Sequence, residues 1–373
     1  MGKRFEQEIR RFDQGQTGSA DSAFSQHFDI YSDPNRLIPY RSTEAESNAT
    51  SAANFGLFNP RNFLLGTDGK MYAIGDNNDT GLTQILEKAD PTTGNWGLST
   101  TAVGNGAVCY GSFIEWQGAL WFFQGTNQVG RWVIATTTIT NTVTAVLAET
   151  ITSVAQAVVG ADDNLYMFHN NKVSRISAAG AKTNNVLTNL PSDMRIVSAC
   201  RWGSYIAIGM AYGTSATALP TGISKVFIWD MVTTTTINDV IDWGEGALRV
   251  LGNVEGRLVG VSDRFLTNPI SLSRGSMVVR MWAGGTVQVM KEIVANQLVT
   301  VDSGTFANVV TRFPRDVIVK DNVMYWVASV PFDASTSTES TFHLGIWAFG
   351  RKDVNSDFAL SLPCGSVSFG QVS

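Results

Sequence analysis

The residues best suited to acid–base or metal chemistry in this chain are its three histidines, His27, His169 and His343. They are far apart in the sequence, and no pair of them has the spacing of metal ligands. The chain also has no G-x-S-x-G nucleophile elbow and no H-E-x-x-H sequence. We therefore expect structural or exposed histidines, and we predict no catalytic, cofactor-binding or metal-binding residue and no enzymatic activity.

Neighbouring carboxylates include Asp162 with Asp163 and Asp242 with Glu245. Two acids at a suitable separation can hydrolyse a glycosidic bond, one acting as the acid and the other as base or nucleophile. Both pairs lie at or beside predicted turns, where carboxylates are usually solvated. We expect them to be surface turn residues.

The string GDNNDTG places oxygens on Asp76, Asn78 and Thr80, two residues apart, with Gly81 to turn the chain. This spacing is similar to the start of a calcium-binding loop. The acid that completes an EF-hand loop is missing downstream. The string is therefore interpreted as a polar hairpin loop.

Composition excludes several classes of function. The net charge is −5, whereas nucleic-acid binding usually needs a basic face. No run of about 20 apolar residues is present, so no membrane-spanning helix is expected. The start, MGKRFEQEIRRF, has charges where a secretory signal needs apolar residues. Cys109, Cys200 and Cys364 have no metal-type spacing, and Cys109 and Cys200, which lie in apolar runs, are expected to be buried, reduced thiols.

One short pattern recurs six times from residue 54 onward. A turn pair is followed within two residues by a strand that carries two large apolar residues. Asp-Gly and Asp-Asn pairs suit tight hairpins because they tolerate positive φ angles. The six turn pairs are Asp68-Gly69, Gln117-Gly118, Asp163-Asn164, Trp202-Gly203, Glu255-Gly256 and Asp321-Asn322. The strands that follow begin at Met71, Leu120, Leu165, Tyr205, Leu258 and Met324, which are 49, 45, 40, 53 and 66 residues apart.

Each unit also has an apolar run before the turn and two further strands after the hairpin. The third strand often carries a tryptophan, at Trp132, Trp229, Trp282 and Trp347. Four antiparallel strands repeated every 40–50 residues are typical of propeller blades. The sequence thus predicts an all-β fold, with a β-propeller over residues 51–373. Six blades are expected, and seven are the alternative if CGSVSFGQVS begins another blade.

Residues 1–50 differ from the repeats and are predicted to form an N-terminal arm. FEQEIRRF has the spacing of a short helix, a Gly/Ser/Gln-rich tether follows, and two prolines make the next segment extended. A short amphipathic helix needs a surface on which to dock. We expect apolar side chains of this arm to bind a partner, namely Phe5, Ile9, Phe12, Phe28, Ile30, Tyr31, Leu37, Ile38 and Tyr40.

The chain combines an extended arm segment with threonine-rich strands. The arm segment is HFDIYSDPNRLIPYRSTEAES, and the strands are TTTITNTVTAV and VTTTTIND. In this it resembles structural proteins of tailed-bacteriophage virions that contain β-propellers, such as tail and tail-nozzle proteins. The resemblance implies a virion component, made in the host cytoplasm and assembled in multiple copies. Its partners would be copies of itself and other virion proteins. The net negative charge also fits a channel through which DNA passes without specific binding.

Two other classes of function remain open. A receptor-binding propeller that binds or hydrolyses a host surface glycan is the alternative, motivated by ten tryptophans and the loop acids. A cellular scaffold that binds peptides is suggested only by KVFIWDM, which resembles the Trp-Asp end of a WD40 repeat. The other third strands lack an Asp after the Trp, and no Gly-His dipeptide opens any unit.

Overall fold

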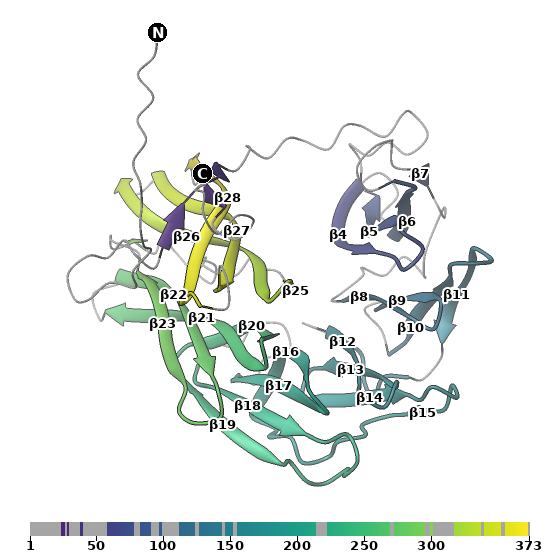
Figure 1. Cartoon of the computed structure of the whole chain (residues 1–373). Coiled ribbons are helices and arrows are strands. Elements are labelled where there is room, and N and C mark those ends of the chain that lie inside the picture. The colour runs from purple at the N-terminus through teal and green to yellow at the C-terminus, as the bar shows by residue number, and fades with distance from the viewer. Residues whose placement is uncertain are drawn as a thin grey trace. The chain divides into compact units, whose positions relative to one another are not determined.

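The structure is a computed structural model, shown in Figure 1. It describes residues 24–26, 28–29, 38–39, 58–77, 83–90, 97–98, 112–123, 127–143, 146–151, 155–213, 222–268, 272–294, 299–300, 317–336, 339–351 and 355–371. All regular structure in these ranges is β. Within them no helix has the length and hydropathy needed to cross a membrane.

The chain divides into two compact units. Unit 1 comprises Met1–Thr43, Phe265–Arg280 and Gln288–Ser373, and unit 2 comprises Glu44–Arg264 and Met281–Val287. The expected boundary between arm and propeller, near residue 50, falls outside the described residues.

Four four-stranded antiparallel sheets follow one another along unit 2. Sheet 1 contains β4 (Phe58–Leu65), β5 (Met71–Asn77), β6 (Thr83–Lys88) and β7 (Gly97–Leu98). Sheet 2 contains β8 (Phe113–Trp116), β9 (Ala119–Phe123), β10 (Val129–Val133) and β11 (Thr138–Val143). Sheet 3 contains β12 (Ala155–Val159), β13 (Leu165–His169), β14 (Lys172–Ile176) and β15 (Lys182–Thr183). Sheet 4 contains β16 (Met194–Trp202), β17 (Tyr205–Tyr212), β18 (Ser224–Trp229) and β19 (Asp239–Gly244).

Two further sheets continue the series. Sheet 5 contains β20 (Ala247–Val254), β21 (Arg257–Asn268), β22 (Leu272–Trp282) and β23 (Gln288–Val294), and β24 (Val299–Thr300) pairs with β22. Sheet 6, in unit 1, contains β25 (Ile318–Lys320), β26 (Val323–Thr336), β27 (Glu339–Arg351) and β28 (Phe358–Gln371). From the arm, β1 (Phe24–Gln26) joins sheet 6 beside β28, while β2 (Phe28–Asp29) and β3 (Ile38–Pro39) pair with each other.

The repeated antiparallel sheets confirm the predicted all-β propeller fold, and six of them are present in the described residues. The alternative prediction was that CGSVSFGQVS begins a seventh blade. It is wrong for Cys364–Gln371, because these residues continue β28 and pair with β27. The last sheet does gain a strand from the arm. That strand is Phe24–Gln26, whereas Ile38–Pro39 form β3 and pair with β2.

Hairpin turns confirm most of the predicted turn pairs. Both central residues have positive φ at Gln117-Gly118, Glu255-Gly256 and Asp321-Asn322, as the twist of a two-residue hairpin demands. The fourth turn is shifted by one residue from the prediction. Trp202 is the last residue of β16 and pairs with Tyr205, so the turn is Gly203-Ser204.

Sheets 1 and 3 share a longer, five-residue turn with one internal pattern. In sheet 1 the Gly66 N–H donates to the carbonyl of Lys70, and Asp68 Oδ1 accepts from the Lys70 N–H. Tyr72 follows in β5, and its hydroxyl donates to Asp68 Oδ2 at 2.7 Å. A carboxylate inside the turn therefore fixes a tyrosine that points out of the next strand.

Sheet 3 repeats these contacts. The Gly160 N–H donates to the Asn164 carbonyl, and Asp162 Oδ1 accepts from the Asn164 N–H. The Tyr166 hydroxyl donates to Asp162 Oδ2 at 2.6 Å. The turn of sheet 3 is thus built on the same Gly-x-Asp-x-x-x-Tyr sequence as that of sheet 1.

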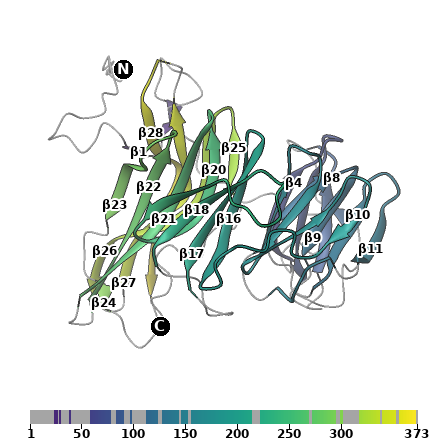
Figure 2. The same cartoon turned by 90° about the horizontal axis from the view of Figure 1, so that it is seen from below.

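Successive sheets of unit 2 pack against one another through apolar clusters. Figure 2 shows β4 of sheet 1 beside β8 of sheet 2, and β12 and β16, the first strands of sheets 3 and 4, are also in contact. Tyr72 of sheet 1 meets Trp132 of sheet 2, and Tyr166 of sheet 3 meets Trp229 of sheet 4, both edge-on with ring centroids 5.3 Å apart. All four aromatic rings are buried. The turns therefore position the tyrosines that close two of the sheet-to-sheet interfaces.

Polar contacts near the first strands also join neighbouring sheets. Gln156 Oε1 in β12 accepts from the Ala199 N–H in β16 at 2.5 Å, and Ser198 Oγ in β16 accepts from the Leu251 N–H in β20 at 2.9 Å. β16 has an irregular register between Ile196 and Ser198. Because β16 is an edge strand of sheet 4, the N–H groups on its outer side are available to a neighbouring sheet.

The fourth strand of sheet 3 ends before the buried pair Val186 and Leu187. β15 ends at Thr183, and Asn185 has φ +49°, which interrupts an extended ladder. Val186 and Leu187 are both buried although they are adjacent, so they do not alternate as residues of a one-sided strand would.

Candidate functional site

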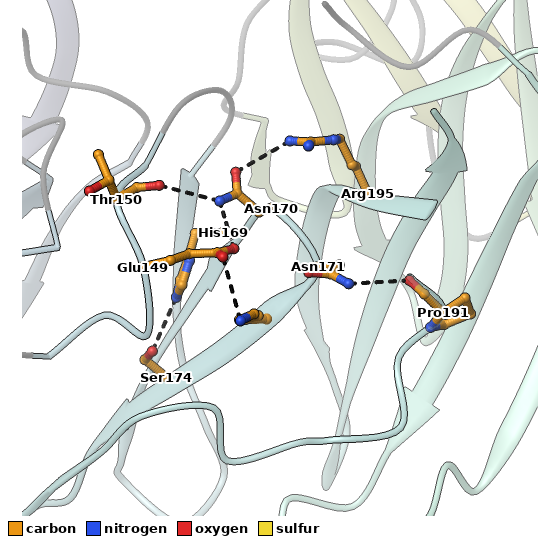
Figure 3. Close-up of polar contacts among 9 residues, drawn as sticks. Glu149, Thr150, His169, Asn170, Asn171, Ser174, Pro191 and Arg195 are labelled. Atoms are coloured by element: carbon orange, nitrogen blue, oxygen red, sulfur yellow. Dashed lines mark hydrogen bonds and ion pairs between the residues drawn. The ribbon is translucent and has the colours of Figure 1, made fainter. Parts of the chain in front are cut away.

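A polar cluster that joins two sheets is centred on Asn170, in the turn between β13 and β14 (Figure 3). Asn170 Nδ2 donates to Glu149 Oε1 at 2.7 Å and to the Thr150 carbonyl at 3.3 Å. Arg195 Nη1, at the start of β16, donates to Asn170 Oδ1 at 3.4 Å. The Asn170 carbonyl accepts from the Ile196 N–H. One residue therefore joins the loop before sheet 3, the sheet itself and sheet 4; we call this the Asn170 cluster.

Local backbone geometry explains the choice of asparagine. Asn170 has φ +51°, a left-handed conformation that asparagine adopts more readily than most residues. Its amide offers both donors and an acceptor, so it can bridge an acid and a base simultaneously. Lys172 Nζ completes the cluster with an ion pair to Glu149 Oε2 at 3.4 Å, and both side chains are about one-third exposed. Such a pair contributes little to stability.

His169 lies directly beside the cluster and is completely buried. Its Nε2 is 3.1 Å from the hydroxyl of Ser174, which is also completely buried, and its Nδ1 has no hydrogen-bond partner. Burial lowers the pKa of His169 to about 4, although the nearby Glu149 carboxylate opposes the shift. The imidazole is therefore neutral at pH 7.

A Ser–His pair raises the question of nucleophilic catalysis. In a working triad, a carboxylate orients the second ring nitrogen of the histidine, and the serine faces a substrate. His169 Nδ1 has no such partner, and neither His169 nor Ser174 is accessible to solvent. The pair fits the structural role expected for this histidine.

A buried ion pair lies in sheet 5. Arg249 Nε and Nη2 approach Asp263 Oδ2 at 2.8 and 2.7 Å, and both side chains are less than one-tenth exposed. Burial raises the pKa of the Asp263 carboxyl, while the Arg249 guanidinium opposes this. Breaking such a pair from one side leaves a buried charge, which typically costs about 3–5 kcal/mol. The pair holds β20 against β21.

The other sites considered from the sequence do not come together as a catalytic or metal centre where they fall within the described residues. No group of three metal-ligating side chains occurs in the parts of the chain that the structure describes. Asp162 and Asp163 do not work as a pair, since Asp162 is engaged with Tyr166. Asp242 Oδ1 accepts from the Gly244 N–H at the end of β19 and forms a local turn contact.

The remaining candidates are placed only in part. Asp76 lies in β5, while Asn78, Thr80 and Gly81 of the calcium-like string are outside the described residues. Cys200 in β16 is a free thiol, and burial raises its pKa to about 12. A thiol with so high a pKa is a poor nucleophile at neutral pH.

Two of the nine predicted arm residues have a described backbone. Phe28 lies in β2 and pairs with Pro39 of β3, and Ile38 pairs with Asp29. The other seven residues, Phe5, Ile9, Phe12, Ile30, Tyr31, Leu37 and Tyr40, lie outside the described residues.

The arm contributes β1 to sheet 6, a contact that was not predicted. Phe24, Ser25 and Gln26 pair in parallel with Leu360, Ser361 and Leu362 of β28. The sequence signal for it was faint, because FSQ is a three-residue strand within a Ser/Gly/Gln-rich stretch.

The Asn170 cluster was also missed. It depends on residues 20–25 positions apart in the sequence, which no local motif connects.

No protein family and no curated protein matches this sequence. Among solved structures, the computationally designed Ika8 protein superposes with a TM-score of 0.42 at 10% identity, over 72% of this chain and 80% of that one. BamB from Moraxella catarrhalis superposes with a TM-score of 0.37 at 19% identity. The match covers 54% of this chain and 53% of BamB, so the chain spans about half the length of BamB. The N-terminal domain of Nup159 gives 0.36 at 9% identity, over 77% and 73%. Since all three scores are below 0.5, the fold assignment rests on the sheets described above.

Proposed function

We propose that this protein is a structural component of a tailed-phage virion, in the tail, nozzle or adaptor, and that it assembles in multiple copies through its N-terminal arm. The observation that carries the proposal is the pairing of β1 with β28. The arm is a strand donor, and the last sheet presents an edge that accepts a strand. The same contact between neighbouring copies would build a symmetric assembly without any new surface.

The polar groups in the described residues support a structural role. Asn170 bridges two sheets, His169 is buried beside Ser174, and Asp263 is paired with Arg249. Each side chain is used to hold strands together. This pattern suits a protein whose task is to keep its shape within an assembly.

The first test is deletion of residues 1–46, which removes the arm together with β1. We expect the propeller to remain folded, with β-type circular dichroism and a cooperative thermal transition, but the multi-copy assembly to be lost in light scattering after size exclusion. A matched deletion of residues 1–22 keeps β1, β2 and β3 and removes Phe5, Ile9 and Phe12. Normal assembly of the longer deletion would show that the arm does not carry the assembly.

The second test concerns the location of the protein. Mass spectrometry of purified virions should detect the chain at a constant stoichiometry, and gold-labelled antibody should mark one fixed part of the tail. Detection of the chain only in the lysate, with none in particles, would disprove the virion assignment.

The alternative function, glycan recognition, needs exposed aromatic side chains. Of the nine tryptophans within the described ranges, eight are buried, and only Trp202 is partly accessible. Trp202 packs against Tyr205, which is 38% exposed, with ring centroids 6.1 Å apart. This pair is the place where a sugar ring could stack. Binding on a glycan array that disappears in Tyr205→Ala would favour the alternative.

A further inference from the structure

His169 differs from the other buried polar groups described above because it can gain a proton for which its site offers no partner. The imidazole and the hydroxyl of Ser174 are both completely buried, and Nε2 lies 3.1 Å from Ser174 Oγ. Nδ1 has no hydrogen-bond partner among the described residues. A neutral imidazole carries a proton on only one of its nitrogens, whereas a protonated imidazole donates from both. Protonation would therefore add a buried charge and an unpaired N–H.

A buried charge without a partner is unfavourable, so a group in this position either stays neutral or moves toward water. Burial accordingly lowers the pKa of His169 from 6.5 to about 4 in the folded chain. Any local opening that brings the ring to solvent restores its ordinary affinity for a proton. Such an opening becomes more favourable as the pH falls below 6.5, because the open form then binds a proton that the closed form does not.

Charged side chains around His169 favour movement of the ring in one direction. Glu149, in the loop before sheet 3, is about one-third exposed, and its carboxylate raises the pKa of His169. Lys172, opposite His169 in β14, acts in the reverse sense and is paired with Glu149. β12, on the other side of β13, has no charged residue, and Arg195 at the start of β16 contacts Asn170. A protonated ring is thus attracted toward Glu149, whose side chain reaches solvent.

Asn170, the next residue, connects His169 to the junction between sheets 3 and 4 (Figure 3). The Asn170 carbonyl accepts from the Ile196 N–H in β16. Its side-chain amide donates to Glu149 and accepts from Arg195. Because the two residues are adjacent, displacement of the His169 ring from the core would move this turn and strain its contacts with β16.

We propose that His169 is an acid-sensitive switch for this junction, and that its protonation releases the Asn170 turn from β16. The junction is closed at pH 7 and opens increasingly as the pH falls from 6.5 toward 4. The opening is local, because His169 is the last residue of β13 and Leu165–Phe168 keep their pairing with β12 and β14. The inference goes beyond the proposed function and does not depend on it, since it concerns one junction within unit 2.

The Ile196 N–H reports on this junction directly, because its acceptor is the Asn170 carbonyl. Hydrogen–deuterium exchange of the full chain at pH 7, 5.5 and 4, corrected for the intrinsic pH dependence of exchange, gives its protection factor. We expect this factor to fall about a hundredfold between pH 7 and pH 4. The internal control is the Leu251 N–H, which donates to Ser198 Oγ between sheets 4 and 5. At pH 4 it should remain better protected than Ile196 by about tenfold or more.

Equal protection of the two amides at pH 4 would mean that both exchange only through global unfolding, which would overturn the local switch. Unchanged protection of Ile196 across the pH range would overturn it as well.

Two variants separate the imidazole from the neighbouring carboxylate. His169→Gln keeps a donor for Ser174 but cannot become charged, so the protection of Ile196 should change little between pH 7 and pH 4. Glu149→Gln removes the carboxylate that favours the protonated ring, so the response should persist but move to lower pH. A response that is lost in Glu149→Gln and kept in His169→Gln would assign the titration to the carboxylate and reject the inference.

A titration of the wild-type chain keeps the inference testable if His169→Gln does not fold. The imidazole signals of the three histidines are followed by NMR, and the signal of His169 is assigned by elimination with His27→Gln and His343→Gln. The His169 ring should titrate near pH 4, and the protection of Ile196 should level off there. Titration near 6.5 would show that the ring is already open to solvent at pH 7 and would reject the switch.

Discussion

The interfaces between successive sheets of unit 2 are of two kinds. Between sheets 1 and 2, and between sheets 3 and 4, a tyrosine held by its own turn meets a tryptophan of the next sheet, at the same 5.3 Å separation. Between sheets 2 and 3, and between sheets 4 and 5, a tryptophan at the end of the first strand donates to a turn carbonyl of the next sheet. Trp116 Nε1 donates to the Asp163 carbonyl at 3.1 Å, and Trp202 Nε1 donates to the Gly256 carbonyl at 2.7 Å.

The two kinds alternate, which shows that one sheet is not the full structural repeat of this region. In the first kind, the hydrogen bond lies within one sheet and the aromatic rings meet across the interface. In the second kind, the hydrogen bond itself crosses. Substitutions that alter a turn should therefore reach the neighbouring sheet by two routes, through the tyrosine in the first kind and through the accepting turn carbonyl in the second.

The largest expected effect comes from removing the tryptophan partner. Trp229 is completely buried against Tyr166, so Trp229→Ala should destabilise folding by about 3–5 kcal/mol through lost burial and a cavity. Trp132→Ala at the equivalent place should cost a similar amount. Chemical denaturation of both variants measures the loss. A cost below about 1 kcal/mol at either position would contradict the assigned packing.

Phenylalanine variants sharpen this comparison. Trp229 Nε1 donates to the Thr233 carbonyl at 2.6 Å, whereas the buried Trp132 Nε1 has no hydrogen-bond partner. Trp229→Phe should therefore cost about 1 kcal/mol more than Trp132→Phe, since only the first loses a hydrogen bond. An equal or reversed order would mean that the indole contacts differ from those described.

The next effect is a pH dependence that originates in sheet 3. The pKa of His169 falls from 6.5 to about 4 on folding, so between these values the unfolded chain binds a proton that the folded chain does not. The stabilising contribution is complete above pH 6.5 and is lost as the pH falls toward 4, by about 3 kcal/mol in total. Denaturation at pH 7, 5.5 and 4 measures it. In His169→Gln the decline should be shallower, and an identical decline would contradict the assignment.

Much of the fold could be predicted from the sequence because the hairpin signal is local. Asp-Gly, Gln-Gly and Asp-Asn report directly on positive φ angles, and each adjoins an apolar strand. The Gly203-Ser204 turn was displaced by one residue because Trp202 looked like part of the turn, although its indole is needed in the strand to reach Gly256. The arm strand Phe24–Gln26 was missed because three residues carry no periodicity.

The Asn170 cluster could not be predicted, since it depends on tertiary placement. Glu149, Asn170 and Arg195 meet only after two sheets have packed. The Gly-x-Asp-x-x-x-Tyr motif, unlike the Asn170 cluster, is local, and both of its copies can be read in the chain, as GTDGKMY and GADDNLY. Recognising it requires the physical link from turn carboxylate to phenol, which the pattern of apolar residues alone does not supply.

A smaller effect is expected at the glycines that open the five-residue turns. A Cβ on Gly66 would lie 2.6 Å from Asp68 Oδ1 and 2.8 Å from the Tyr72 ring. A Cβ on Gly160 would meet Tyr166 and also Met231, beside sheet 4, both at 2.7 Å.

Both alanine variants should therefore lose about 2 kcal/mol, with Gly160→Ala the more costly because it also disturbs sheet 4. Gly285→Ala is the control, since no atom lies within 4 Å of the place that its new methyl group would occupy. Thermal unfolding of the three variants gives the order. If Gly160→Ala were as stable as Gly285→Ala, the turn would not be holding the interface.

The smallest effect separates the two tyrosine turns from each other. Asp162 Oδ2 accepts from Asn164 Nδ2 as well as from Tyr166, whereas the contact described for Asp68 Oδ2 is with Tyr72 alone. Removing the phenol should cost about 1 kcal/mol in each case. Tyr72→Phe should be slightly worse, because its carboxylate oxygen loses the partner that the structure gives it. Paired variants with Asp68→Asn and Asp162→Asn, combined in double-mutant cycles, measure the coupling. We expect the Asp–Tyr coupling energy to be larger in sheet 1 than in sheet 3. A larger coupling energy between Asp162 and Tyr166 than between Asp68 and Tyr72 would contradict this order.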